Sequence, residues 1–356
     1  MEGSIIDILI FAPLAPILGV MLFWFIQLLF IESEKYLLSK IRPKHEPLCR
    51  FTNFLGILFQ TISHALGYTV TKSGISDFYI SVEYGKVAPK KEKKGAFEWI
   101  SNAFLFIGPF FIPAFLLLLC LFLLINFDFA STSQTLELKY TFGGQITAFG
   151  IGLYSFTKNF FELLFTLDLL HPGHLGFLLL LIFLGMGIRP SYIGEKKIEK
   201  VDMLYELKNV WNLIKNKPSY FIILFLIAYI VFYLSIFFNQ NWYVTLFTIF
   251  GWLSIISIIS IIITNLILYL VKTTDDIPRF WKVVPFVILP VSYILLRLLF
   301  LYYPVDFTTT ISLIIMILLT VIVTYILLYT KTNKFKFKLG IKLLKKKIKD
   351  DTDERG

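Results

Sequence analysis

Long apolar runs separated by short polar segments make up most of this sequence. About 18 consecutive apolar residues are enough to cross a bilayer as a helix, so each longer run is a predicted span. The predicted spans lie near residues 8–31, 103–126, 144–170, 220–238, 243–271, 283–302 and 308–330. Two further segments, 51–68 and 175–188, are ambiguous, and the second has only 14 residues. The pattern predicts seven to nine membrane segments.

The composition excludes a soluble globular protein. Hydrophobic residues make up 57% of the chain and charged residues 16%, and the mean hydropathy is +0.75. The sequence therefore predicts an all-α polytopic integral membrane protein. The net charge of +10 does not indicate a nucleic-acid partner, because the Lys and Arg residues lie between apolar runs, where they report membrane orientation.

Loop charge orients the second half of the chain. Lys and Arg in short loops are retained on the cytoplasmic side, whereas acidic residues have little influence. Segments 189–218 and 272–282 are basic, and the turns 239–241 and 303–307 contain no basic residue. This alternation predicts two helical hairpins and a cytoplasmic C-terminus.

The first half is less regular. The first apolar run lacks a basic leader and is too long for a cleaved signal peptide, so it is expected to be a retained span. Loops 32–50 and 70–100 are both basic and both predicted to be cytoplasmic, which is incompatible with a full crossing by 51–68. Either 51–68 is re-entrant, or the first loop is an exception. Segment 128–142 is neutral or acidic and is expected outside.

Two polar segments carry local patterns of their own. Residues 74–85 alternate apolar and polar positions, which is typical of a strand, so we expect a small β element on the cytoplasmic side. Leu207, Val210, Trp211 and Ile214 recur at helical spacing and predict an amphipathic helix on the membrane surface.

The C-terminal tail is rich in lysine and is expected to contact anionic lipid headgroups. The lysines that carry this prediction are Lys342, Lys345, Lys346 and Lys347. The chain thus divides into five parts. They are an N-terminal span with a basic loop (1–50), a membrane core with a β region at 69–100 (51–190), an amphipathic segment (191–218), a four-span region (219–330) and the basic tail (331–356).

Three of the four histidines lie at predicted helix breaks. They are His64, His171 and His174, and Asp168 precedes His171 by one helical turn. Three imidazoles and one carboxylate suit Zn²⁺, which takes nitrogen and oxygen ligands. The alternative is that His64 packs at a helix end and that the His-Pro-Gly-His segment is an interfacial turn. The two cysteines form neither a disulfide framework nor a Cys-based metal site.

Charged residues inside apolar runs are the second chemical signal. Lys158 and Glu162 are spaced i and i+4, and Arg297 lies within the 283–302 span. Charges at bilayer depth are costly, so the first two are expected to pair and to face protein or a cavity. Arg297 is open to the same two interpretations, structural pairing or a proton path. Asn265 is a candidate for an interhelical hydrogen bond.

The order of features between residues 50 and 190 resembles the site-2 protease family of intramembrane zinc metalloproteases. A helix ends in Phe59–Gly67, a short basic β region follows, a span opens with Asn102–Pro109, and a later break covers Leu167–Gly176. In that family the first helix bears HExxH and a later motif supplies the third zinc ligand. The resemblance implies a helical membrane core with a β region and a possible Zn²⁺ cofactor.

The catalytic positions of that family are altered in this chain. Where HExxH is expected the chain has Gln60 and Thr61, and only the second histidine, His64, remains. Threonine cannot replace the carboxylate that activates a metal-bound water. Gly176 stands where the third ligand is expected. The resemblance therefore implies a non-proteolytic binding or regulatory homologue that binds a membrane segment, a lipid or a protein partner.

Two other functions remain open from the residues. One is a divergent zinc protease that uses His64, His171 and His174, with a base from Glu162 or Asp168. The other is a transporter or channel that uses Lys158, Glu162 and Arg297. Nucleotide-driven transport has no support, because the chain contains neither a Walker A motif nor another Gly-rich phosphate loop.

Overall fold

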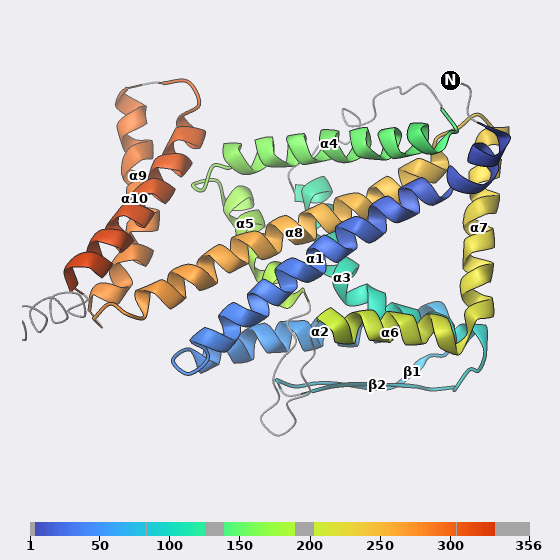
Figure 1. The fold of residues 1–356 in the computed structure, drawn as a ribbon. Helices are drawn as coiled ribbons and strands as arrows, with labels where there is room; N and C mark the ends of the chain where they lie inside the picture. The colour runs from blue at the N-terminus through green and yellow to red at the C-terminus, as the bar shows by residue number, and fades with distance from the viewer. Residues whose placement is uncertain are drawn as a thin grey trace, which may run out of the picture. The chain divides into compact units, whose positions relative to one another are not determined.

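The computed structural model describes residues 4–82, 84–124, 139–188, 203–278, 280–303 and 305–331. Helices dominate it (Figure 1). The helices are α1 (Leu14–Ile41), α2 (Glu46–Val70), α3 (Ala96–Leu124), α4 (Phe142–Thr166), α5 (Pro172–Gly187), α6 (Met203–Asn216), α7 (Pro218–Phe237), α8 (Trp242–Thr274), α9 (Val284–Tyr302) and α10 (Thr308–Lys331), with short turns η1 (Asp7–Phe11) and η3 (Trp281–Val283). The strands are β1 (Ile75–Ile80) and β2 (Gly85–Pro89).

Six of the described helical segments are long and apolar enough to cross a membrane. They are 14–41, 96–123, 218–237, 242–274, 281–302 and 308–330, and they correspond to six of the seven predicted spans. The chain is therefore an integral, multi-pass membrane protein. The seventh predicted span, 144–170, forms α4, which is not among these six, and neither are α2 and the 16-residue α5. The predicted count of seven to nine is not confirmed.

The chain divides into two compact units. The first contains residues 1–164 and 171–268, and the second contains residues 165–170 and 269–356. The chain enters the second unit at Phe165, in the last turn of α4, returns at His171, and leaves the first unit again within α8. The short connector between α4 and α5 thus belongs to the same unit as α9 and α10.

Helices α2, α3 and α5 pack against one another in the first unit. Their contacts are close because small residues lie at the crossings. A Cβ atom on Gly67 would lie 3.1 Å from the Ser101 backbone, and one on Gly187 would lie 2.5 Å from the Phe59 ring. A buried cluster of Leu28, Ile31, Phe110, Ile188 and Ile261 joins α1, α3 and α8 to the end of α5.

The β element is an antiparallel hairpin in which Phe78 pairs with Val87 and Ile80 with Gly85. The predicted β element is confirmed, but the strand expected over 74–85 ends at Ile80, and Gly85 begins a second strand. The hairpin runs along α2: near one end Asn53 Nδ2 donates to the Val82 carbonyl at 2.7 Å, and at the other Lys93 Nζ donates to the Thr71 carbonyl. Eighteen residues of α2, about 27 Å of helix, therefore have the hairpin beside them.

Helices line two opposite sides of the first unit. In Figure 1, α4 lies along one side of this unit and α2, α6 and the hairpin lie along the opposite side, with α3 and α5 between them. The predicted amphipathic helix forms α6, in which Leu207 packs on the core cluster and Trp211 is exposed.

Tyrosine hydroxyls attach the N-terminal segment to the rest of the first unit. Tyr229 and Tyr233 of α7 donate to the carbonyls of Ile10 and Leu9, and Tyr243 of α8 donates to the Pro13 carbonyl. These bonds satisfy carbonyl groups where the chain passes from the turn η1 into α1.

Candidate functional site

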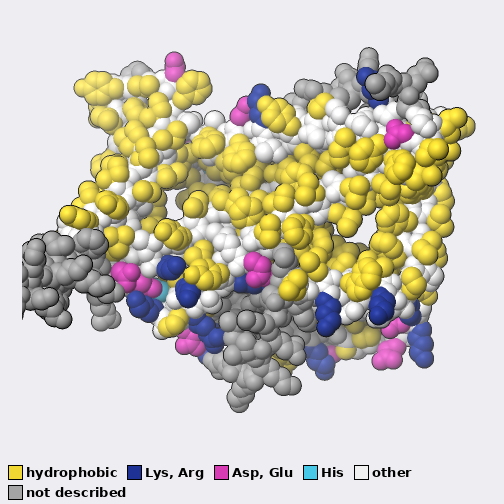
Figure 2. Space-filling view, in the orientation of Figure 1, with side chains coloured by type: hydrophobic (Ala, Val, Ile, Leu, Met, Phe, Trp, Pro, Cys, Tyr) yellow, Lys and Arg dark blue, Asp and Glu magenta, His cyan; other side chains and the backbone are white. Residues whose placement is uncertain are grey.

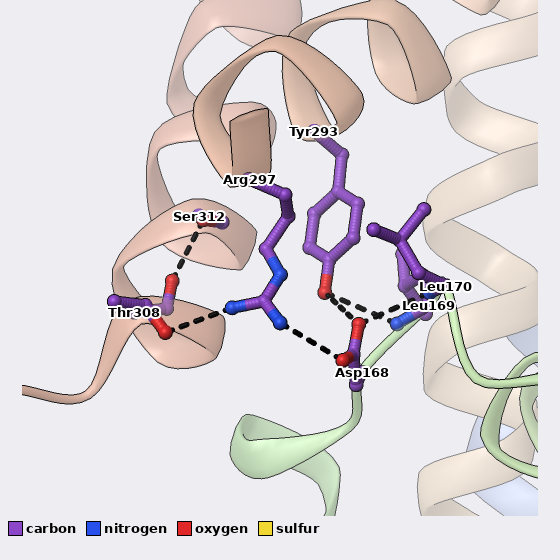
Figure 3. Close-up of polar contacts among 7 residues, drawn as sticks. All are labelled: Asp168, Leu169, Leu170, Tyr293, Arg297, Thr308 and Ser312. Atoms are coloured by element: carbon purple, nitrogen blue, oxygen red, sulfur yellow. Dashed lines mark hydrogen bonds and ion pairs between the residues drawn. The ribbon is translucent and has the colours of Figure 1, made fainter. Parts of the chain in front are cut away.

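A network of polar side chains surrounds Asp168 in the second unit. Arg297 and Tyr293 are four residues apart on α9, so both project from one face of that helix toward the Asp168 carboxylate (Figure 3). Arg297 Nη2 lies 2.9 Å from Asp168 Oδ2, and Tyr293 Oη donates to Asp168 Oδ1 at 3.1 Å. Asp168, predicted as a zinc ligand, thus pairs with Arg297, the predicted charge within an apolar span.

Two backbone N–H groups of the connector also donate hydrogen bonds to this network. The Leu170 N–H donates to Asp168 Oδ1, and the Leu169 N–H donates to the Tyr293 hydroxyl, each at 3.1 Å. Both carboxylate oxygens are therefore occupied. In this conformation the Asp168 carboxylate pairs with Arg297, Tyr293 and the Leu170 N–H.

Arg297 also links α9 to the start of α10. Its Nη1 donates to Thr308 Oγ1 at 2.8 Å, and Ser312 Oγ donates to the Thr308 carbonyl at 2.7 Å. The Arg297 Nε atom is buried and has no hydrogen-bond partner within the described part of the chain. Sequence reasoning missed Tyr293 and Thr308, although the spacing of Tyr293 and Arg297 on one helix face was visible.

Hydrogen bonds and charge hold Asp168 ionised. Partial burial by itself raises the pKa of this carboxyl, but the Leu170 N–H, the Tyr293 hydroxyl and the Arg297 guanidinium together lower the pKa below its ordinary value. The arrangement is a clamp that joins the α4–α5 connector to α9, and through Arg297 to α10.

The three histidines predicted as zinc ligands are separated along the helices of the first unit. His171 and His174 are neighbours, with ring centroids 4.7 Å apart. Both histidines lie at the N-terminal end of α5. The C-terminal end of α5, at Gly187, is the end that contacts Phe59 of α2. Thirteen residues of helix, about 20 Å, separate His174 from Gly187. His64 lies one turn past Phe59.

His64 packs against Tyr68, with ring centroids 5.7 Å apart, and its buried Nδ1 has no partner. Burial lowers the pKa of the imidazole below its ordinary value, which favours the neutral form. Within the described ranges no three or more His, Cys, Asp or Glu side chains are arranged to hold a metal ion. Asp168 lies in the connector rather than one helical turn before His171, because α4 ends at Thr166. Zinc binding stays a prediction.

The Lys158–Glu162 ion pair forms on α4, with Nζ and Oε1 3.8 Å apart. The predicted pairing is confirmed, and the two side chains are 59% and 63% exposed among the described residues. The opposite face of α4 carries the buried Phe149, Leu153 and Phe156. The basic tail lysines, including Lys342, Lys345, Lys346 and Lys347, lie outside the described residues.

Comparisons with known proteins give no relative. No family model, curated protein or solved structure matches this chain.

Proposed function

We propose that this protein is a non-proteolytic membrane protein that keeps the helix order of the site-2 proteases and acts by binding a transmembrane segment or a lipid. The observation that carries the proposal is the environment of Thr61, which stands in place of the HExxH glutamate. Thr61 is buried, and its Oγ1 donates to the Ile57 carbonyl at 2.7 Å. It offers neither a carboxylate nor access for water.

The hairpin fills the space beside this position. A Cβ atom on Gly85 would lie 2.1 Å from Thr61 Oγ1, so only glycine fits there. Two residues further along α2, Ser63 is buried and lies against Gly108 of α3. The surface of α2 that would activate water in a peptidase is packed against protein. The mutual packing of α2, α3 and α5 supports the helix order that the resemblance implies.

A cleavage assay tests the loss of peptidase activity. The purified chain, incubated in detergent with single-span membrane substrates and added Zn²⁺, is expected to cleave none of them, while an active site-2 protease in the same detergent cleaves its own substrate. Cleavage that both a chelator and His64→Ala abolish would contradict the proposal and support the divergent zinc protease.

The position of the hairpin also bears on membrane topology. Open sheet edges do not occur in contact with lipid hydrocarbon, because their backbone groups would be unsatisfied. The hairpin lies along α2 from Asn53 to Thr71 and carries an exposed Lys86–Asp77 pair. We infer that α2 lies on the cytoplasmic membrane surface with the hairpin and does not cross. The two basic loops that flank α2 are then on the same side, as their charge predicts.

This placement gives seven crossings, by α1, α3, α5, α7, α8, α9 and α10, with the N-terminus outside and the C-terminus inside. In Figure 2, basic side chains of the first unit gather along the edge formed by α2, α6 and the hairpin, and apolar side chains cover the helices next to it. The 16 residues of α5 span about 24 Å, so its crossing requires local thinning of the bilayer. The anionic lipid headgroups that the basic tail is predicted to contact then belong to the inner leaflet.

Single-cysteine labelling tests this topology. In a background with Cys49→Ser and Cys120→Ser, cysteines replacing Lys44 and Lys90 should both resist a membrane-impermeant thiol reagent in intact cells and both react in inverted vesicles. A cysteine replacing Asn241 should show the reverse behaviour. Labelling of positions 44 and 90 from opposite sides would show that α2 crosses.

A further inference from the structure

Buried polar side chains of α1 and α8 present oxygen acceptors that have no donor. Gln27 and Glu34 on α1 are fully buried, with 0% exposed surface. Gln27 Oε1, both carboxylate oxygens of Glu34 and Asn265 Oδ1 of α8 have no hydrogen-bond partner. Buried polar groups are almost always paired, so four orphan oxygens on two adjoining helices require an explanation.

The hydrogen bond between α1 and α8 places Asn265 near Glu34. Asn265 Nδ2 donates to the Phe30 carbonyl at 3.3 Å, which is an interhelical bond. In an α-helix the carbonyl of residue 30 accepts the hydrogen bond of the residue 34 N–H. The side chain of residue 34 tilts toward the helix N-terminus and so covers the turn that begins at residue 30. The Glu34 carboxylate and the free Asn265 Oδ1 therefore lie at the same level of α1.

Gln27 lies two turns earlier on the same buried face and uses its donor elsewhere. Its Nε2 donates to the Phe110 carbonyl of α3, which also accepts a hydrogen bond from Ser257 of α8. One N–H of each amide, Gln27 and Asn265, is thus engaged with a backbone carbonyl. Among the described residues no donor reaches the Glu34 carboxylate.

An ionised Glu34 would be an uncompensated charge in the protein interior. The adjacent Lys35 is bound to Glu32 at 3.1 Å on the same helix. Burying an unpaired carboxylate costs several kcal/mol, so such a group takes up a proton instead. A protonated carboxyl is neutral and supplies one O–H donor.

We propose that Glu34 is a proton-binding site, and that its carboxylic O–H donates to Asn265 Oδ1 in the packed state. One bound proton then removes the buried charge and satisfies an orphan oxygen on each helix. A metal cation is a poorer fit, because a single carboxylate with two amide oxygens provides few ligands and leaves the carboxylate ionised.

Proton release is coupled to the packing of α1 on α8. Ionisation is favourable only where the carboxylate reaches water or a cation, which requires the two helices to separate at this level. Among the described residues, Glu32 and Lys35 flank the site on α1, α6 carries the buried Glu206 and the exposed Lys208 and Lys215, and α8 carries Lys272. The proposed proton-binding site at Glu34 does not rest on the proposed loss of peptidase activity.

Infrared spectroscopy of the protein in lipid tests the protonation directly. At neutral pH the difference spectrum between wild type and Glu34→Gln should contain the C=O stretch of a protonated carboxylic acid, and this band should be lost in the variant. Glu32→Gln is the matched control on the same helix: it should remove carboxylate bands and leave the acid band in place.

Asn265→Leu provides a second measurement that does not depend on the folding of the Glu34 variant. Removing the acceptor should shift the acid C=O band to higher frequency, because the O–H loses its hydrogen bond. Carboxylate bands assigned to Glu34 at neutral pH, whether Glu34 is bare or bound to Na⁺, would overturn the proposal. An acid band that Asn265→Leu leaves unmoved would overturn the assigned acceptor.

Discussion

Asp168→Asn is expected to lower the free energy of unfolding by about 2–3 kcal/mol, because it removes the counter-charge of Arg297. Arg297 lies within an apolar helix, its Nε is already without a partner, and its side chain is only 21% exposed. Without Asp168 the guanidinium is charged and unpaired at this position. Asparagine keeps the shape of the side chain, so the loss reports charge rather than packing.

The measurement is reversible unfolding of the reconstituted protein in mixed micelles of increasing denaturing detergent. Tyr293→Phe, which removes only the phenolic hydroxyl, should cost about 1 kcal/mol. Glu162→Gln breaks the exposed pair on α4 and should cost less than about 0.5 kcal/mol. Equal costs for Asp168→Asn and Glu162→Gln would show that the Asp168 clamp contributes no more than a surface ion pair.

The same clamp sets a pH dependence. The folded protein holds the pKa of Asp168 below its ordinary value, so its stabilising contribution is fully present above the ordinary carboxyl range. It is lost as the pH falls through the lowered pKa, where Asp168 takes up a proton. Asp168→Asn should remove this acidic component of the stability profile, and wild type and variant should converge at low pH.

Gly185→Ala is expected to have the second large effect, a loss of about 1–3 kcal/mol, because α5 packs against α8 without space for a methyl group. A Cβ atom on Gly185 would lie 2.6 Å from the hydroxyls of Ser260 and Thr264 and 2.7 Å from the Ser260 carbonyl oxygen. A backbone oxygen cannot rotate away. The Ser260 hydroxyl also donates to the Leu181 carbonyl, and the methyl group would disturb that bond.

Gly176→Ala is the matched control on the same helix. No atom lies within 4 Å of a Cβ built there, so alanine should be neutral or should stabilise α5 by about 0.5–1 kcal/mol through its higher helix propensity. Unfolding in the same detergent series measures both variants. If Gly185→Ala matched Gly176→Ala in stability, α5 would not be held as closely to α8 as this structure shows.

The Asp168 clamp and the Gly185 contact lie near the two ends of the short helix α5. Pro172 begins α5 directly after the connector that carries Asp168, and Gly185 rests on α8 near its other end. The Asp168 clamp secures the connector within the second unit, and small residues secure the helix within the first. In the proposed topology this is the helix that must cross a locally thinned bilayer.

The local features of the fold were predictable from the sequence. Six apolar helices, the first strand of the hairpin, the amphipathic α6 and the helix break before Pro172 all follow from the hydrophobic period or from proline and glycine. These signals depend on neighbouring residues along the chain. The second strand was missed because Gly85–Pro89 is short and mostly polar or small.

The candidate sites were predictable only as isolated residues. Asp168 and Arg297 were both noted, yet 129 positions separate them and nothing local indicates that they pair. Glu34 was counted as part of a basic loop, although its spacing from Gln27 and Ile31 places it on the buried helix face. The expected convergence of His64 with His171 and His174 depended on which end of α5 meets α2, which no local pattern encodes.

By itself, the sequence determined that this is a multi-pass helical membrane protein with a small β element, because hydropathy and residue period are local properties of the chain. Only the tertiary structure decided the rest. It placed the hairpin along α2, paired Asp168 with Arg297, buried Glu34, and bonded Asn265 of α8 to the Phe30 carbonyl of α1. Each of these is a contact between distant segments, and its energy depends on what surrounds a side chain rather than on what precedes it.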